Sequence, residues 1–385
     1  MNSYNTFLRF VTVCTVALWA PLAAQAEEPP ARGGRTIYDK PYLTGAGGGV
    51  AVGGYMDMEL EIPEDGTTTF DQYHFVPFIT GYVSDRVTVS AEIEFEHGGQ
   101  VEGGGGGDGE IKVEYAVMDY RLGEGLNFRG GVVLSPLGRF NVLHDSPLND
   151  LTERPLVARQ LVPSTLSEAG MGFFGDFAAG DEGELDYEVY LVNGFNEGII
   201  DDDQRLRVRE GRGSAKQDNN DAKSLVGRLG YSPRLGTTFG LSAHSGAYDD
   251  AGSRNLTIGV LDAKATFGAI ELQGEAATVG ADIDRDLLPQ TADSQRGAYL
   301  QAAWHVLHDK LQAGSVVTLV VRGNWLDYDS DRDGDAERGL ALGANFRPTE
   351  ETVLRADYTW RREAPVDGAM ARAPGRFYFS FATYF

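Results

Sequence analysis

Acidic and basic side chains alternate with leucines and other apolar residues between Pro136 and Glu168. Opposed charges of this kind can set an electric field across a narrow opening and so discriminate among small charged solutes. A segment that stays in water has little use for residues such as Phe140 and Leu156, so we expect it to fold back and pack against the rest of the chain. A packed external Ω-loop is the alternative. The charged candidates are Arg139, His144, Asp145, Asp150, Glu153, Arg154 and Arg159.

A second group of carboxylates occupies alternate positions just before a predicted strand, at Asp329, Asp331, Asp333 and Asp335. With a glycine between the last two, this spacing matches the start of a Ca²⁺-binding loop. The bidentate glutamate expected at the twelfth position is absent, because Leu340 stands there. The sequence leaves two readings open, a calcium site in an external loop and a solvated acidic loop.

Hydrolytic chemistry would need a histidine beside a nucleophile and an acid. His97 and His144 are the histidines predicted near the external side with acids close by, and no G-x-S-x-G motif accompanies them. The sequence therefore favours a protein that is not an enzyme, and an outer-membrane hydrolase is kept as a lesser alternative.

The beginning of the chain predicts export. Residues 1–26 carry one charged side chain, Arg9, then an apolar stretch and the small-residue pattern Ala24-Gln25-Ala26. This is a secretory signal peptide with cleavage before Glu27. A lipoprotein reading of Cys14 is disfavoured, because the cysteine lies inside the apolar stretch. The mature chain 27–385 then has no cysteine for a disulfide or a thiolate metal site.

The composition excludes two classes of protein. The formal net charge of −24 argues against nucleic acid as a partner, since phosphate binding requires a basic face. The longest apolar runs of the mature chain, such as 316–321, are far shorter than a membrane-spanning helix requires.

The segment from Arg376 to Phe385 places large aromatic residues at every second position. On a soluble protein an exposed strand with such an apolar face would promote aggregation, whereas in a closed barrel the same face contacts lipid. The pattern resembles the terminal insertion signal of outer-membrane barrels, with Thr383 as its weaker position.

Period-two alternation recurs through the mature chain, and the connections alternate between short and long. Short periplasmic turns and long external loops are typical of a transmembrane antiparallel β-barrel in the bacterial outer membrane, here of about sixteen strands with the third long loop, 136–168, folded inward. The acidic external loops would face divalent cations that bridge lipopolysaccharide. The predicted strands are 48–61, 70–82, 87–97, 110–121, 126–135, 169–176, 185–193, 223–232, 237–246, 255–266, 270–279, 297–306, 315–326, 338–347, 352–362 and 376–385.

The alternation assigns a lipid face and a lumen face to each strand. In 110–121, for example, Tyr115 and Val117 are expected to point outward. Charges of both signs on the lumen face need water or partners, and a barrel of this size encloses an aqueous channel unless something blocks it. We expect an open pore, with a polar plug as the alternative. The predicted pore-lining residues are Glu92, Glu94, Lys112, Glu114, Arg129, Arg228, Glu271, Glu275, Arg322 and Arg355.

Three segments resemble the phosphate-selective porin O and P family, and the third long loop is similar to the inserted loop of general trimeric porins. The segments are 127–138, 189–195 and 225–233. The resemblance implies a homotrimeric, passive, 16-stranded channel for small hydrophilic solutes or ions.

The anion selectivity of that family is not expected here, because it relies on ladders of arginine and clusters of lysine along the pore. The lysines of this chain are few and scattered, whereas Glu92, Glu94, Glu271 and Glu275 favour cations or neutral solutes. A non-conducting barrel that acts as an adhesin or a structural protein needs the same wall, and the sequence does not separate it from a porin.

Overall fold

The computed structural model describes residues 44–45, 49–99, 109–213, 215–363 and 371–385. The predicted signal peptide, 1–26, lies outside the described residues. No helix in the described part of the chain has the length and apolar character to cross a membrane.

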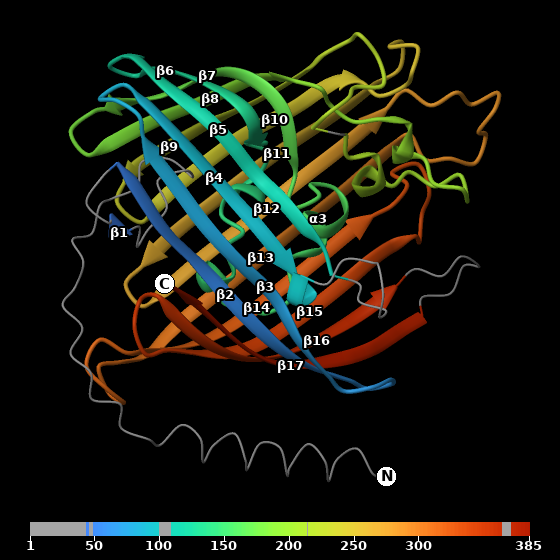
Figure 1. Cartoon of the computed structure of the whole chain (residues 1–385). Helices are drawn as coiled ribbons and strands as arrows, with labels where there is room; N and C mark the ends of the chain where they lie inside the picture. The colour runs from blue at the N-terminus through green and yellow to red at the C-terminus, as the bar shows by residue number, and fades with distance from the viewer. Residues whose placement is uncertain (1–43, 46–48, 100–108, 214, 364–370) are drawn as a thin grey trace.

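Sixteen long strands, β2 to β17, form one closed antiparallel barrel (Figure 1). Each strand pairs with the next along the chain, and β17 pairs with β2, from Tyr384 opposite Tyr55 to Arg376 opposite Pro63. The two-residue strand β1 (Thr44–Gly45) adds to β2 beyond that seam. The barrel strands are β2 (Val50–Pro63), β3 (Thr69–Tyr82), β4 (Val87–Glu96), β5 (Ile111–Gly123), β6 (Leu126–Leu134), β7 (Ser167–Ala179), β8 (Gly183–Val192), β9 (Ser224–Arg234), β10 (Thr237–Ala247), β11 (Asn255–Phe267), β12 (Ile270–Ala281), β13 (Ser294–His308), β14 (Val316–Asp327), β15 (Ala336–Arg347), β16 (Thr352–Glu363) and β17 (Ala371–Tyr384).

The predicted strand count, antiparallel order and closure are confirmed. Some strand boundaries differ from the predicted ones, because small residues obscure the alternation at the ends of those strands. The predicted turn 177–184 shrinks to three residues, because the ladder between β7 and β8 continues through Phe177 opposite Leu185 to Ala179 opposite Gly183.

The outer surface of the barrel is apolar, as the alternation predicted. Leu225, Leu229 and Tyr231 of β9 are exposed, and the same strand turns Val226 and Arg228 inward. One part of this assignment was wrong: Tyr115 and Val117 point inward and are buried. A bulge on β5 causes the reversal, because Glu92 pairs with Tyr115 and Ile93 with Val113, which leaves Glu114 as an extra residue that shifts the phase of the strand.

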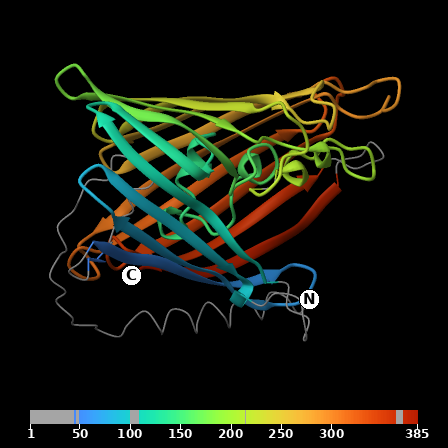
Figure 2. The same cartoon turned by 45° about the horizontal axis from the view of Figure 1, so that its top comes forward.

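The segment between β6 and β7, residues 135–166, lies inside the barrel and is called the inner loop below (Figure 2). It carries three short helices, α2 (Arg139–Val142), η2 (Ser146–Leu148) and α3 (Leu156–Gln160). Its predicted inward fold is therefore confirmed. Its apolar side chains, among them Leu156 and Leu161, pack against inward-facing residues of β11 to β14 such as Ile258 and Leu326.

A second connection, between β8 and β9, packs on top of the inner loop. This covering loop, residues 193–213 and 215–223, contains η3 (Glu197–Ile199) and η4 (Val208–Gly211). Val208 joins the same apolar cluster as the inner loop, and Arg209 Nη1 donates to the Ser164 carbonyl at 3.0 Å. This second layer was not predicted from the sequence. The remaining short helix is η1 (His97–Gly99), directly after β4.

Candidate functional site

The inner loop is fixed to one side of the barrel by arginines that point inward from the wall. Arg322 of β14 donates through Nη2 to the Glu153 carbonyl at 2.6 Å. Arg355 of β16 donates to the Ser146 carbonyl at 2.9 Å and to its hydroxyl at 3.0 Å. Both guanidinium groups are buried. These two predicted pore-lining residues thus lie against the inner loop and bind its backbone.

Side chains of β5 and β17 also hold this loop, through carboxylate contacts. His144 Nε2 lies 3.1 Å from Glu114 Oε2 on β5, and Thr165 donates to the other oxygen of Glu114 at 2.7 Å. Asp145 accepts a hydrogen bond from the Tyr384 hydroxyl of β17 at 2.9 Å. Glu92 lies buried in the same region, and its carboxylate converges with His144 and Asp145.

The remaining charged residues of the inner loop also have partners. Asp150 accepts from Gln301 Nε2 and from Asn345 Nδ2, each at 3.1 Å. Glu153 and Arg159 form an ion pair within the loop. The predicted constriction residues therefore do lie inside the barrel, and most of them serve to anchor the loop.

Glu275 of β12 anchors the start of the loop by accepting the backbone N–H of Phe140. The other predicted lining residues pair along the wall. Arg129 binds Asp119 through both carboxylate oxygens at 2.7 Å, Arg228 pairs with Asp262 at 2.6 Å, and Lys264 with Glu271 at 2.7 Å. Paired in this way, these charges avoid the cost of burying an unpartnered ion.

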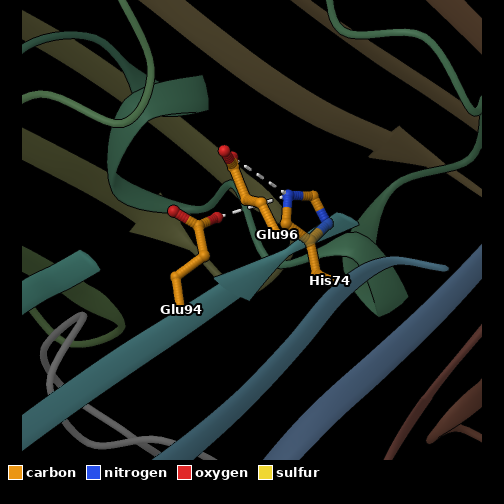
Figure 3. A group of neighbouring side chains, drawn as sticks. All are labelled: His74, Glu94 and Glu96. Atoms are coloured by element: carbon orange, nitrogen blue, oxygen red, sulfur yellow. Dashed lines mark ion pairs between the residues drawn. The ribbon is translucent and has the colours of Figure 1, made fainter. Parts of the chain in front are cut away.

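An acidic and histidine-containing cluster lies on β3 and β4 (Figure 3), and Asp57 of β2 adjoins it. His74 Nε2 is 3.3 Å from Glu94 Oε1 and 3.9 Å from Glu96 Oε1. Its Nδ1 is 3.0 Å from Asp57, and Arg154 of the inner loop places Nη2 3.3 Å from Nε2. Lys112 donates to the second oxygen of Glu94 at 3.0 Å.

Sequence reasoning missed His74, Asp57 and Glu96 as parts of a site. The available signal was the phase of the strand, since His74 precedes outward-facing Phe75 and pairs across the sheet with Glu96. The contact with Arg154 could not be found in this way, because it depends on the path of the inner loop.

A cavity of about 490 Å³ opens between the inner loop and the wall formed by β7 to β10. Arg139 at the start of α2 and Arg228 line it together with acidic groups of the wall, and the Arg139 guanidinium lies 3.4 Å from the Thr238 hydroxyl. Basic and acidic side chains thus share one aqueous space, as expected for a passage that sorts solutes by charge. The acidic lining residues are Asp176, Glu184, Asp186 and Glu188.

The four carboxylates of the predicted calcium loop lie in the connection between β14 and β15. Asp331 and Asp333 are exposed, and Asp329 accepts the backbone N–H of Asp331 at 3.1 Å. Burial and the neighbouring Asp327 raise the pKa of Asp335 to about 6. A metal site requires ligand atoms that converge. Among the described residues, the groups that meet this requirement lie inside the barrel and not in this loop. Calcium binding by this loop stays a prediction.

The comparisons agree with the barrel geometry. No family model matches the chain. An uncharacterized protein of Aquifex aeolicus (strain VF5) is 27% identical over 340 residues, which cover 80% of this chain and 75% of that protein.

Several solved structures share the fold. The anion-selective porin from Comamonas acidovorans superimposes with a TM-score of 0.56 at 12% identity, covering 87% of this chain and 99% of its own. The outer membrane channel DcaP of Acinetobacter baumannii gives 0.56 at 10% identity, covering 89% and 99%. OmpT, an outer membrane protein of Vibrio cholerae in trimer form, gives 0.54 at 10% identity, covering 87% and 99%. At these identities the likeness shows the fold alone, which is that of a porin-type transmembrane barrel.

Proposed function

We propose that this chain forms a narrow, passive channel across the bacterial outer membrane for small hydrophilic solutes, with a preference for cations or neutral molecules. The observation that carries the proposal is the inner loop, which is held inside a closed barrel by side chains of β5 and β14 and leaves a charged cavity beside it. A loop fixed at this depth narrows a wide barrel to a passage that selects by size and charge.

The sign of the selectivity follows from the balance of charge in that cavity. Asp262 neutralises Arg228, so Arg139 is the less engaged cation there, facing several wall carboxylates. The whole chain carries 57 acidic against 33 basic residues, so its net charge also favours cations over anions. The proposed channel therefore differs in selectivity from the anion-selective porin that shares its fold.

A homotrimer and membership of the phosphate-selective porin O and P family belong to the same proposal. The short sequence segments support family membership, and the trimer form of OmpT, which has the same fold, supports the oligomer. Sedimentation of the detergent-solubilised chain would test the trimer, because a chain of 41.7 kDa gives well-separated masses for one and three copies.

A second candidate is a non-conducting barrel, an adhesin or a structural protein. It is favoured by the packing inside the barrel, where Glu92, Glu94 and Glu114 are fully buried and the covering loop packs against the inner loop. A hydrolase has less support, because in the described barrel His144 contacts Glu114 and a backbone carbonyl, and no nucleophile is among its hydrogen-bond partners.

Recording from the refolded mature chain in a planar bilayer separates these candidates. The channel predicts small, uniform conductance steps and a reversal potential that favours cations in a salt gradient. Silence from the wild-type chain, together with steps from a variant that lacks residues 140–163, would identify a plugged barrel. A strong anion preference would contradict the proposed selectivity.

A further inference from the structure

Three potential metal ligands meet on the inner wall of the barrel, on the adjacent strands β3 and β4 (Figure 3). His74, Glu94 and Glu96 each offer one ligand atom, and all three atoms lie within 4.8 Å of one another. The 3.3 Å between His74 Nε2 and Glu94 Oε1 is close to the spacing of two ligands that share one small cation at bond lengths of about 2.1 Å.

Asp57 fixes the histidine in the orientation that a metal requires. Its carboxylate accepts the backbone N–H of His74 at 2.7 Å and contacts the ring Nδ1 at 3.0 Å. Because an ionised carboxylate only accepts hydrogen bonds, Nδ1 carries a proton, and Nε2, which faces the two glutamates, is the ring nitrogen available to a metal ion. A carboxylate behind a histidine is the usual second partner of a metal-binding imidazole.

His74 Nε2 and Glu94 Oε1 face each other, and this arrangement needs a positive group between or beside the two atoms. Glu94 is fully buried, and its Oε1 accepts no hydrogen bond from the described residues. Lys112 satisfies the other oxygen at 3.0 Å. In this structure the guanidinium of Arg154 supplies the positive charge, 3.3 Å from Nε2. The site therefore attracts cations, and the positive group that occupies it here, the Arg154 guanidinium, belongs to the inner loop.

We propose that His74, Glu94 and Glu96 form a binding site for a divalent transition-metal cation of the Zn²⁺ class, which competes with the Arg154 guanidinium for His74 Nε2. One nitrogen and two carboxylate ligands with a remaining open position suit Zn²⁺ better than Ca²⁺, which prefers oxygen alone. The side chain of Glu96 is 21% exposed and provides the way in. The site does not depend on conduction, because neighbouring strands of the wall supply every ligand.

Titration calorimetry with ZnCl₂ tests the site on the refolded, chelator-treated chain near neutral pH. We expect saturable binding of one zinc ion per chain. His74→Gln and Glu94→Gln should each weaken binding by more than about 100-fold, and Asp57→Asn by about 10-fold or more, because Asp57 acts through the histidine. Arg154→Gln should strengthen binding, since it removes the competing cation.

The chain also offers a matched control. His305 and His308 lie close together on β13, with ring centroids 5.9 Å apart, and the double change His305→Gln/His308→Gln should leave the high-affinity binding unchanged. Visible absorption of the wild-type chain loaded with Co²⁺ gives a second readout that needs no variant. Absence of saturable zinc binding would overturn the proposal, and His74 would then simply form hydrogen bonds with the neighbouring carboxylates. Binding that is lost in the His305/His308 double variant but survives His74→Gln would also overturn it.

Discussion

Glu114 on β5 accepts a hydrogen bond from His144 of the inner loop at 3.1 Å, and both side chains are fully buried. The other ring nitrogen of His144 lies 2.8 Å from the Asn141 carbonyl. Since both partners are acceptors, the ring donates from both nitrogens and carries a positive charge. This buried ion pair fixes the middle of the inner loop to the acidic wall.

His144→Gln should therefore destabilise the barrel by about 3 to 5 kcal/mol, because it leaves the Glu114 carboxylate buried without its counter-ion. Urea unfolding followed by tryptophan fluorescence measures the effect. The double variant His144→Gln/Glu114→Gln should recover part of the loss, since the stranded charge is then absent. A single variant as stable as the wild type would show that the pair does not hold the loop.

Gly343 on β15 leaves the space that Leu151 of the inner loop occupies. A Cβ added there would come within 2.5 Å of a Leu151 methyl and 2.8 Å of Asp357 Cβ. Gly343→Ala should cost about 1 to 3 kcal/mol through overpacking and make single-channel currents noisier as the loop shifts. Gly323→Ala on β14 is the matched control, because its Cβ would meet no described atom within 4 Å. Equal behaviour of the two variants would argue against close packing of the loop.

Arg139 should set part of the charge selectivity, because it lines the cavity opposite Asp186 and Glu188. Arg139→Gln is expected to shift the reversal potential further toward cations, and Asp186→Asn to shift it back. Both changes are measured in the same salt gradient, and higher ionic strength should reduce them. If neither variant moves the reversal potential, solutes pass elsewhere or not at all.

The external carboxyl of Asp335 should titrate in an unusual range. Burial raises the pKa of Asp335 to about 6, and a hydrogen bond with Asp327 and the like charge of Asp327 contribute to this shift. A raised pKa means that the folded loop favours the protonated acid, so its ionisation weakens the loop as pH rises through about 6 and the penalty vanishes in more acidic buffer.

Carbon-13 NMR of labelled aspartate side chains can follow that titration. A midpoint near pH 6 is expected for Asp335, and the signal should be lost in Asp335→Asn. Calcium that bound this loop would stabilise the carboxylate and lower the midpoint. A midpoint in the ordinary range for aspartate without calcium would contradict the burial of this group.

The barrel was predictable because lipid and water act on alternate residues of every strand, and the sequence records that alternation directly. The inward fold of the inner loop followed from its leucines. The reversal at Tyr115 was not predictable, since one extra residue in a strand leaves no compositional mark. The same holds for the contact between Arg154 and His74, which joins residues far apart in the sequence through the path of a loop.

The seam between β2 and β17 has a consequence for biogenesis. Gly54 and Phe385 exchange backbone hydrogen bonds at 2.9 and 3.1 Å across it, and the ring of Phe385 stacks on Phe75. These strands are the most widely separated in sequence of all paired strands in the described barrel, so the cylinder cannot close until every strand between them is in place. Until then both edges of the sheet expose unpaired peptide groups, which makes an unfinished barrel prone to aggregation.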